Sequence, residues 1–193
     1  MKIVIRNKNW SSWSMRPWLA LKLTGLSFEE IIIPLRQGEI TQEAIRQLSP
    51  AGKVPILIDN ALTIHDSLAI CEYLAERAPL WPKEADKRAL ARAITCEMHS
   101  GFASLRSTCP MDIAKRTTTE ITPDVAKDLA RIEAIWAHAT GPFLFGTPCI
   151  ADCFYAPVVS RFVTYSLPTS DTSKRYIDTI WNWDLFQEWV KGS

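Results

Sequence analysis

The chain has 193 residues, of which 47% are hydrophobic and 22% charged, and its formal net charge is +1. This composition is typical of a soluble globular protein with a buried core, and the balanced charge gives no support for binding to nucleic acid or a membrane surface. No apolar run approaches the roughly 18 residues of a membrane span, and the first ten residues lack the apolar core of a secretion signal. We therefore expect a cytoplasmic location.

The first 80 residues alternate between short β-branched segments and segments with helical periodicity. Expected strands cover residues 2–6, 28–33, 54–58 and 61–64, and expected helices cover residues 14–24, 41–48 and 67–77. Ser14 is placed to cap the first helix and Gly25 to end it. The order β-α-β-α-β-β-α predicts an α/β domain over residues 1–80.

Strand signals disappear after a proline-flanked linker at residues 79–82. Helical periodicity then covers residues 83–108, 122–140, 151–165 and 172–190. The change of pattern predicts an all-α domain over residues 81–193 that packs on the first domain.

The chain has five cysteines, an odd number, and no Cys-x-x-Cys pair. Cys149 and Cys153 are four residues apart, but no nearby histidine or further cysteine completes a metal-binding set. We therefore expect reduced thiols and no metal site.

Hydroxyls and tryptophans crowd the junction of the first strand and helix, in the stretch NWSSWSMRPWLALK. Ser11 and Ser12 follow the strand, at the end of the sheet where open α/β proteins bind ligands. A hydroxyl here is able to donate a hydrogen bond to a thiolate and so lower the thiol pKa. The alternative is a local serine turn.

Two later positions are also unusual. Pro55 interrupts the third strand, and a cis Val54–Pro55 bond would leave the Val54 backbone free to pair with a peptide-like ligand; the alternative is a trans proline on an edge strand. Asp66 and Ser67 stand at a helix start, where free N–H groups attract a ligand carboxylate, although such residues are more often caps.

In this order and spacing, the three sites resemble those of the cytosolic glutathione S-transferases. The motifs that carry the resemblance are SSWSMR at 11–16, SPAGKVPIL at 49–57, LTIHDSLAICEYL at 62–74, EMHSGFASLRSTCPMDI at 97–113 and IADCFYAPVVSRF at 150–162. The resemblance implies a thioredoxin-like domain that binds glutathione, a helical domain that supplies the electrophile pocket, and a homodimer.

The resemblance also implies residue roles. Ser11 matches the serine whose hydroxyl stabilises the glutathione thiolate, and Ser12 is the second choice. The implied glutathione-binding residues are Lys53, Val54, Pro55, Asp66 and Ser67. The substrate-pocket candidates are Trp13 at the cleft rim and, on one face of the long helix, His99, Phe102 and Arg106. Helix packing is the alternative for these last three residues.

SSWS and TIHDSLAI resemble SSCS and TIHQSLAI of the zeta class, whose members isomerise maleylacetoacetate with glutathione as cofactor. Here Trp13 replaces the zeta cysteine. The sequence therefore predicts a glutathione transferase for small electrophiles. The alternatives are a zeta-like isomerase, a glutathione- or ligand-binding protein with little turnover, and an interaction module with the same fold.

Overall fold

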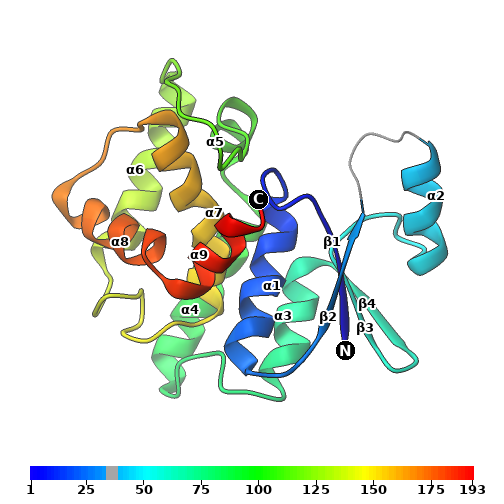
Figure 1. Cartoon of the computed structure of the whole chain (residues 1–193). Helices are drawn as coiled ribbons and strands as arrows, with labels where there is room; N and C mark the ends of the chain where they lie inside the picture. The colour runs from blue at the N-terminus through cyan, green and yellow to red at the C-terminus, as the bar shows by residue number, and fades with distance from the viewer. Residues whose placement is uncertain (34–38) are drawn as a thin grey trace.

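The computed structural model of the chain describes residues 1–33 and 39–193. Its first part contains a four-stranded mixed sheet with helices on both faces (Figure 1). The elements in chain order are β1 (Lys2–Arg6), α1 (Ser12–Thr24), β2 (Glu29–Ile33), α2 (Glu39–Leu48), β3 (Ile56–Asp59), β4 (Leu62–His65) and α3 (Ser67–Ala75). This arrangement confirms the predicted thioredoxin-like domain.

The strand order is β2-β1-β3-β4, with β1 parallel to β2 and antiparallel to β3. Val4 lies opposite Ile31 on one side and Ile56 on the other. Because β1 is central, its apolar residues are buried from both faces, and Ile3, Val4 and Ile5 are fully buried. The loop that follows β1 therefore starts from a fixed position beside α1.

The second part is helical, as predicted. It consists of α4 (Ala85–Ser100), α5 (Ala103–Thr108), α6 (Pro123–Ala137), α7 (Ile150–Tyr165), α8 (Asp171–Trp181) and α9 (Asp184–Lys191). Helix α7 is buried along nearly its whole length and packs against α1, α4 and α8. One continuous core thus joins the two parts. The predicted boundary at residues 80–81 falls between α3 and α4 and stays a prediction.

Two predicted helices differ from the structure. The first begins at Ser12, so Ser14 lies inside α1 and the residue at the cap position is Ser11. The expected single helix over 83–108 is broken: Gly101 is extended, and a Cβ there would lie 2.7 Å from the Glu97 carbonyl oxygen. Phe102 follows with φ 60°. His99, Phe102 and Arg106 therefore do not share one helix face.

Asp152 at the start of α7 holds neighbouring segments by hydrogen bonds. Its carboxylate accepts hydrogen bonds from the backbone N–H groups of Leu144 and Cys149 and from the Tyr176 hydroxyl, each at 3.0 Å. Burial raises the pKa of Asp152 to about 6, against the opposing effect of these donors. The carboxyl group ties three segments of the helical domain together.

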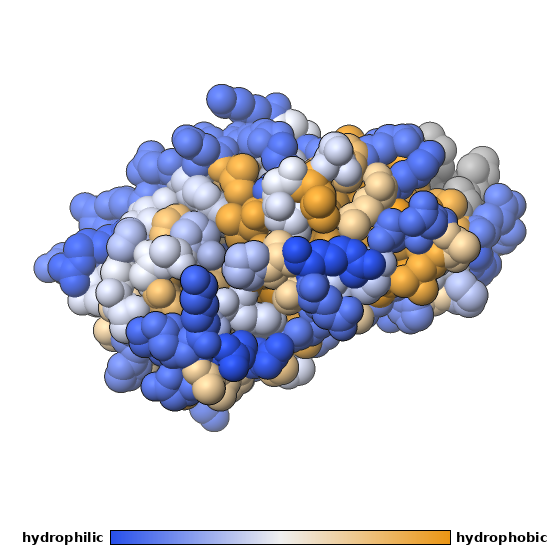
Figure 2. Space-filling model, turned by 90° about the horizontal axis from the view of Figure 1, so that it is seen from below, coloured by the Kyte–Doolittle hydropathy of each residue, from blue (hydrophilic) through white to orange (hydrophobic). Residues whose placement is uncertain are grey.

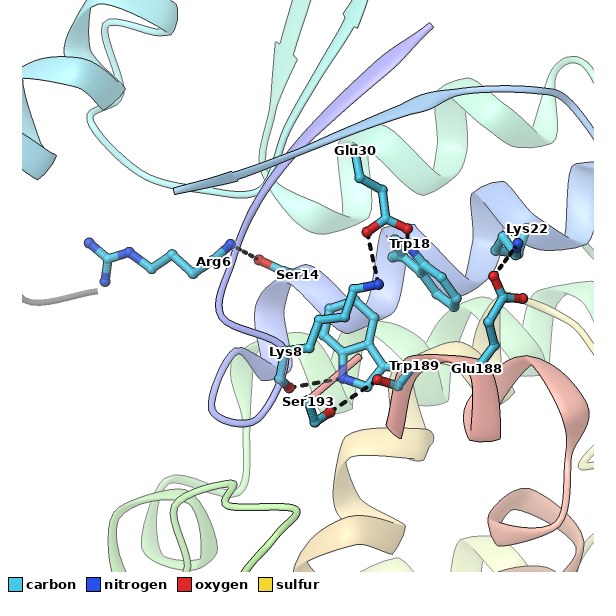
Figure 3. A network of polar contacts seen from close by, with 9 residues as sticks. All are labelled: Arg6, Lys8, Ser14, Trp18, Lys22, Glu30, Glu188, Trp189 and Ser193. Carbon is cyan, nitrogen blue, oxygen red and sulfur yellow. Dashed lines mark hydrogen bonds and ion pairs between the residues drawn. The ribbon is translucent and has the colours of Figure 1, made fainter. Parts of the chain in front are cut away.

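The C-terminal helix returns to the first domain through a buried polar network (Figure 3). The Trp189 indole N–H donates to the Lys8 carbonyl at 2.9 Å, and Lys8 Nζ lies 2.8 Å from a Glu30 carboxylate oxygen. The other oxygen of Glu30 accepts from the Trp18 indole N–H at 2.6 Å. These contacts join α9, β2 and α1 to the loop that leads to Ser11.

On the face seen from below, hydrophobic side chains form patches between polar ones (Figure 2). Large hydrophobic side chains that the fold leaves exposed include Trp10 and Trp13, which line the cleft described next. Within residues 1–33 and 39–193, no helix is long and apolar enough to cross a membrane.

Candidate active site

A cleft of about 1100 Å³ opens at the end of β1, between the start of α1, the loop before β3 and the start of α3. Seven of the predicted site residues line it: Ser11, Trp13, Lys53, Val54, Pro55, Asp66 and Ser67. The other four, Ser12, His99, Phe102 and Arg106, are not part of its lining. Three stretches far apart in sequence thus form one concave surface.

Ser11 presents a side chain that does not cap α1. Its hydroxyl donates to the Ser14 hydroxyl at 2.8 Å, and Ser14 in turn accepts the Arg6 backbone N–H at 3.4 Å. Because hydroxyl hydrogens rotate, Ser14 is equally able to donate to Ser11. Ser11 is then free to direct its own hydrogen to a group in the cleft.

Ser12 is buried, and its hydroxyl lies 3.5 Å from Nη2 of Arg161 on α7. It therefore contacts the helical domain, not the cleft. Between the two serines that the sequence leaves open, this geometry favours Ser11 as the one that meets a ligand.

The peptide bond between Val54 and Pro55 is cis, as the resemblance implies. The two residues precede β3, which begins at Ile56, so Pro55 takes no part in the sheet ladder. Lys53 is exposed just before them, and Gly52 supplies the positive φ of 62° that the preceding turn requires.

At the start of α3, Asp66 is a helix cap. One carboxylate oxygen accepts from the N–H groups of Leu68 at 2.8 Å and Ala69 at 3.3 Å. The other oxygen lies 3.4 Å from His99 Nε2. The cap interpretation of Asp66 is thus correct, and its second oxygen links the two domains.

Ser67 carries the strongest local indication of a ligand. The residue is 1% exposed, lines the cleft, and its hydroxyl oxygen has no hydrogen-bond partner within the described part of the chain. A buried hydroxyl without a partner costs free energy, and a ligand carboxylate or amide would relieve this cost.

The helical-domain candidates lie behind the cleft wall. His99 packs edge-on against Trp13 at 5.4 Å between ring centroids, and burial, more than the charges of Arg16 and Arg106, lowers its pKa. Phe102 is buried in the core. The Arg106 guanidinium donates to the backbone carbonyls of Met98 and His99.

Sequence reasoning missed several functional candidates. Arg6, Arg46 and His65 also line the cleft, and Arg16 and Arg161 are buried beside Ser12 and Trp13. Arg16 lies inside the SSWSMR motif, and Arg106 is already a candidate, but nothing in the helical periodicity indicates that α7 brings Arg161 close enough to act on Arg16.

Family models for the N-terminal and C-terminal domains of glutathione S-transferases match residues 10–77 and 116–191. Glutathione S-transferase Z2 of Arabidopsis thaliana is 30% identical over 77% of this chain and 71% of its own length. The chain belongs to the glutathione S-transferase family. The family match confirms the predicted fold, enzyme class and transferase function.

The chain is also similar to an isomerase and to a solved structure with bound glutathione. Maleylacetoacetate isomerase of Rattus norvegicus is 30% identical, over 83% of this chain and 78% of its own length. The crystal structure of a glutathione transferase homologue from a Burkholderia, with bound glutathione, is 25% identical with a TM-score of 0.74. The superposition covers 98% of this chain and 95% of that one.

Proposed function

We propose that the cleft binds glutathione and that Ser11 stabilises its thiolate for attack on a small electrophile. The observation that carries the proposal is the convergence of the Ser11 hydroxyl, the Val54–Pro55 peptide and the unpartnered Ser67 hydroxyl on one cleft in a member of this family.

The chemistry of the cleft wall matches that of the tripeptide. The Val54 backbone would pair with the cysteinyl unit, as a strand pairs with an added strand. Ser67 and the N-terminus of α3 would hold the γ-glutamyl carboxylate, and Asp66 its ammonium group. Lys53 lines the cleft and would pair with the glycine carboxylate.

The nucleophile in this scheme is the sulfur of glutathione. A hydrogen bond from Ser11 stabilises the thiolate over the thiol and lowers its pKa from about 8.5, so more of the bound ligand is ionised at neutral pH. The sulfur then forms a bond to an electrophilic carbon. The displaced halide leaves with the bonding electrons, or a proton completes an addition.

The test is Ser11→Ala against Ser12→Ala. Removing a preorganised donor to a developing or bound anion lowers turnover by about 10²–10³-fold, so we expect this loss in kcat/KM for 1-chloro-2,4-dinitrobenzene with Ser11→Ala. An ultraviolet titration of bound glutathione should show a raised thiol pKa in that variant alone. A raised thiol pKa in Ser12→Ala, with Ser11→Ala unchanged, would contradict the assignment.

A zeta-like isomerase is the second candidate, and it rests on the maleylacetoacetate isomerase of the rat as a relative. Turnover of maleylacetoacetate, compared with turnover of the aromatic halide, separates the two activities. Binding of glutathione without turnover of either substrate would instead indicate a ligand-binding protein.

We also propose a cytoplasmic homodimer, as expected for the family. Two-fold dimers are the commonest soluble homo-oligomers. Light scattering of the purified protein tests this assembly, and a mass equal to one chain would contradict it.

A further inference from the structure

Trp13 separates the cleft from two cations. The side chain lines the cleft and is 40% exposed. Arg16 and Arg106 do not line the cleft, and their guanidinium carbons lie 4.3 Å and 4.9 Å from the centroid of the Trp13 ring. The indole is thus held by two cation–π contacts and by the edge of His99.

The arginines near Trp13 are incompletely paired among the residues that the structure describes. Arg16 is 1% exposed, and its Nε and Nη1 atoms have no hydrogen-bond partner in the part of the chain that the structure describes. Arg106 Nε is also unpartnered there. Arg161, 4% exposed, donates to the carbonyls of Cys109 and Pro157 and reaches the Ser12 hydroxyl.

None of these three arginines forms an ion pair with a carboxylate among residues 1–33 and 39–193. Burial, and then the charges of Arg106 and Arg161, lower the pKa of Arg16 well below its usual range, although Cys71 and Asp66 oppose this shift. Cations that are shielded from water and have no carboxylate partner attract an anion, and a carboxylate fits a guanidinium group bidentately.

We propose that Trp13 determines substrate selectivity by occupying the place from which a carboxylate would reach Arg16 and Arg106. The indole partly satisfies the two cations and excludes small dicarboxylates, so the cleft accepts planar, uncharged electrophiles. The proposal rests on the proposed function for its link to catalysis. The anion-binding behaviour itself is measurable without turnover.

The first experiment titrates maleate, a small planar dicarboxylate, into the glutathione-loaded protein and measures heat. Trp13→Ala removes the covering ring, and we expect it to bind maleate at least about tenfold more tightly than wild type, because two cation–π contacts no longer compete. Trp13→Phe keeps a smaller ring, so its affinity for maleate should lie between those of wild type and Trp13→Ala. It also serves as the test if the alanine variant does not fold.

Two further variants locate the effect. Trp13→Ala combined with Arg106→Met should return maleate binding to the wild-type level, because one cation is gone. Trp183→Ala removes a tryptophan that packs against Phe143 in the helical domain, and its maleate affinity should equal that of wild type. Equal affinity of wild type and both Trp13 variants would overturn the proposal. Tight binding that persists in the double variant would also overturn it.

A kinetic comparison connects the inference to substrate choice. For 4-chloro-3,5-dinitrobenzoate and its methyl ester, which differ by one charge, wild type should prefer the ester. Trp13→Ala should shift the ratio of kcat/KM toward the acid by about tenfold. If neither compound is turned over while maleate binds as expected, the result counts against the proposed transferase function and not against the role of Trp13.

Discussion

Helix α1 adjoins two groups of buried and half-buried polar side chains that differ in how fully their hydrogen bonds are satisfied. The first, which we call the closed network, consists of Lys8, Trp18, Glu30 and Trp189. In it, the Lys8 ammonium group and the two indole N–H groups each lie 2.6–2.9 Å from an oxygen acceptor. The second, the open set, consists of Arg16, Ser67, His99 and Arg106.

Each member of the open set has at least one buried nitrogen or oxygen without a partner in residues 1–33 and 39–193. Leaving a buried polar atom unpaired costs about 1–3 kcal/mol of folding free energy. The open set carries this cost, and the closed network does not. We infer from this difference that the closed network serves stability. In the open set, Ser67 lines the cleft, where a ligand would pair with its hydroxyl, whereas Arg16, His99 and Arg106 lie outside the cleft lining.

The largest effect on the free energy of unfolding should follow from a substitution that breaks the closed network. Glu30→Ala leaves the Lys8 ammonium group and the Trp18 N–H without their acceptor, and the side chain of Lys8 is only 9% exposed. We expect a loss of about 3 kcal/mol in the free energy of unfolding, measured by urea denaturation.

The neighbouring residue provides a matched control for this variant. Glu29 pairs with Lys2 at 3.0 Å, with both side chains more than half exposed. Glu29→Ala should therefore cost less than about 1 kcal/mol. Equal losses in the two variants would remove the distinction between a closed network and an ordinary surface pair.

A smaller effect, on binding alone, should follow from Ser67→Ala in the open set. Since the hydroxyl has no partner in the described structure, its removal should change the free energy of unfolding by less than about 0.5 kcal/mol. The dissociation constant for glutathione should rise about tenfold, as expected for one lost hydrogen bond to a charged group. Calorimetric titration and urea denaturation measure the two quantities, and destabilisation with unchanged binding would make Ser67 structural.

The smallest effect concerns the pH dependence of stability. The pKa of His99 is lowered by burial, with Asp66 opposing and Arg16 and Arg106 adding to the shift. Below its ordinary pKa of about 6.5, the unfolded chain then binds more protons than the folded chain, so stability falls as pH falls.

His99→Gln should consequently lose less stability than wild type between pH 7 and pH 5.5. Urea denaturation across this range measures the difference, and the titration of Asp152 is common to both proteins. Parallel curves for the two proteins would mean that the folded environment does not disfavour the charged form of His99.

The sequence predicted the parts of the site that depend on local chemistry. Asp66-Ser67 before an apolar helical stretch predicts a helix start, and the structure has Asp66 as the cap there. For Pro55 after valine, the residues alone left a cis and a trans bond open and only the family resemblance implied the cis bond that the structure has. Ser14 shows the limit of such signals, because several serines at one junction compete for the cap position and only the path of the chain selects Ser11.

The sequence by itself determined the α/β and helical organisation and the three stretches that line the cleft, because periodicity, prolines and helix starts act over short distances. Tertiary structure alone decided that Ser12 faces Arg161, that Gly101 ends α4, and that Trp13 covers two arginines. These features depend on contacts between α1, α5 and α7, which are distant in sequence and meet only when the shared core packs.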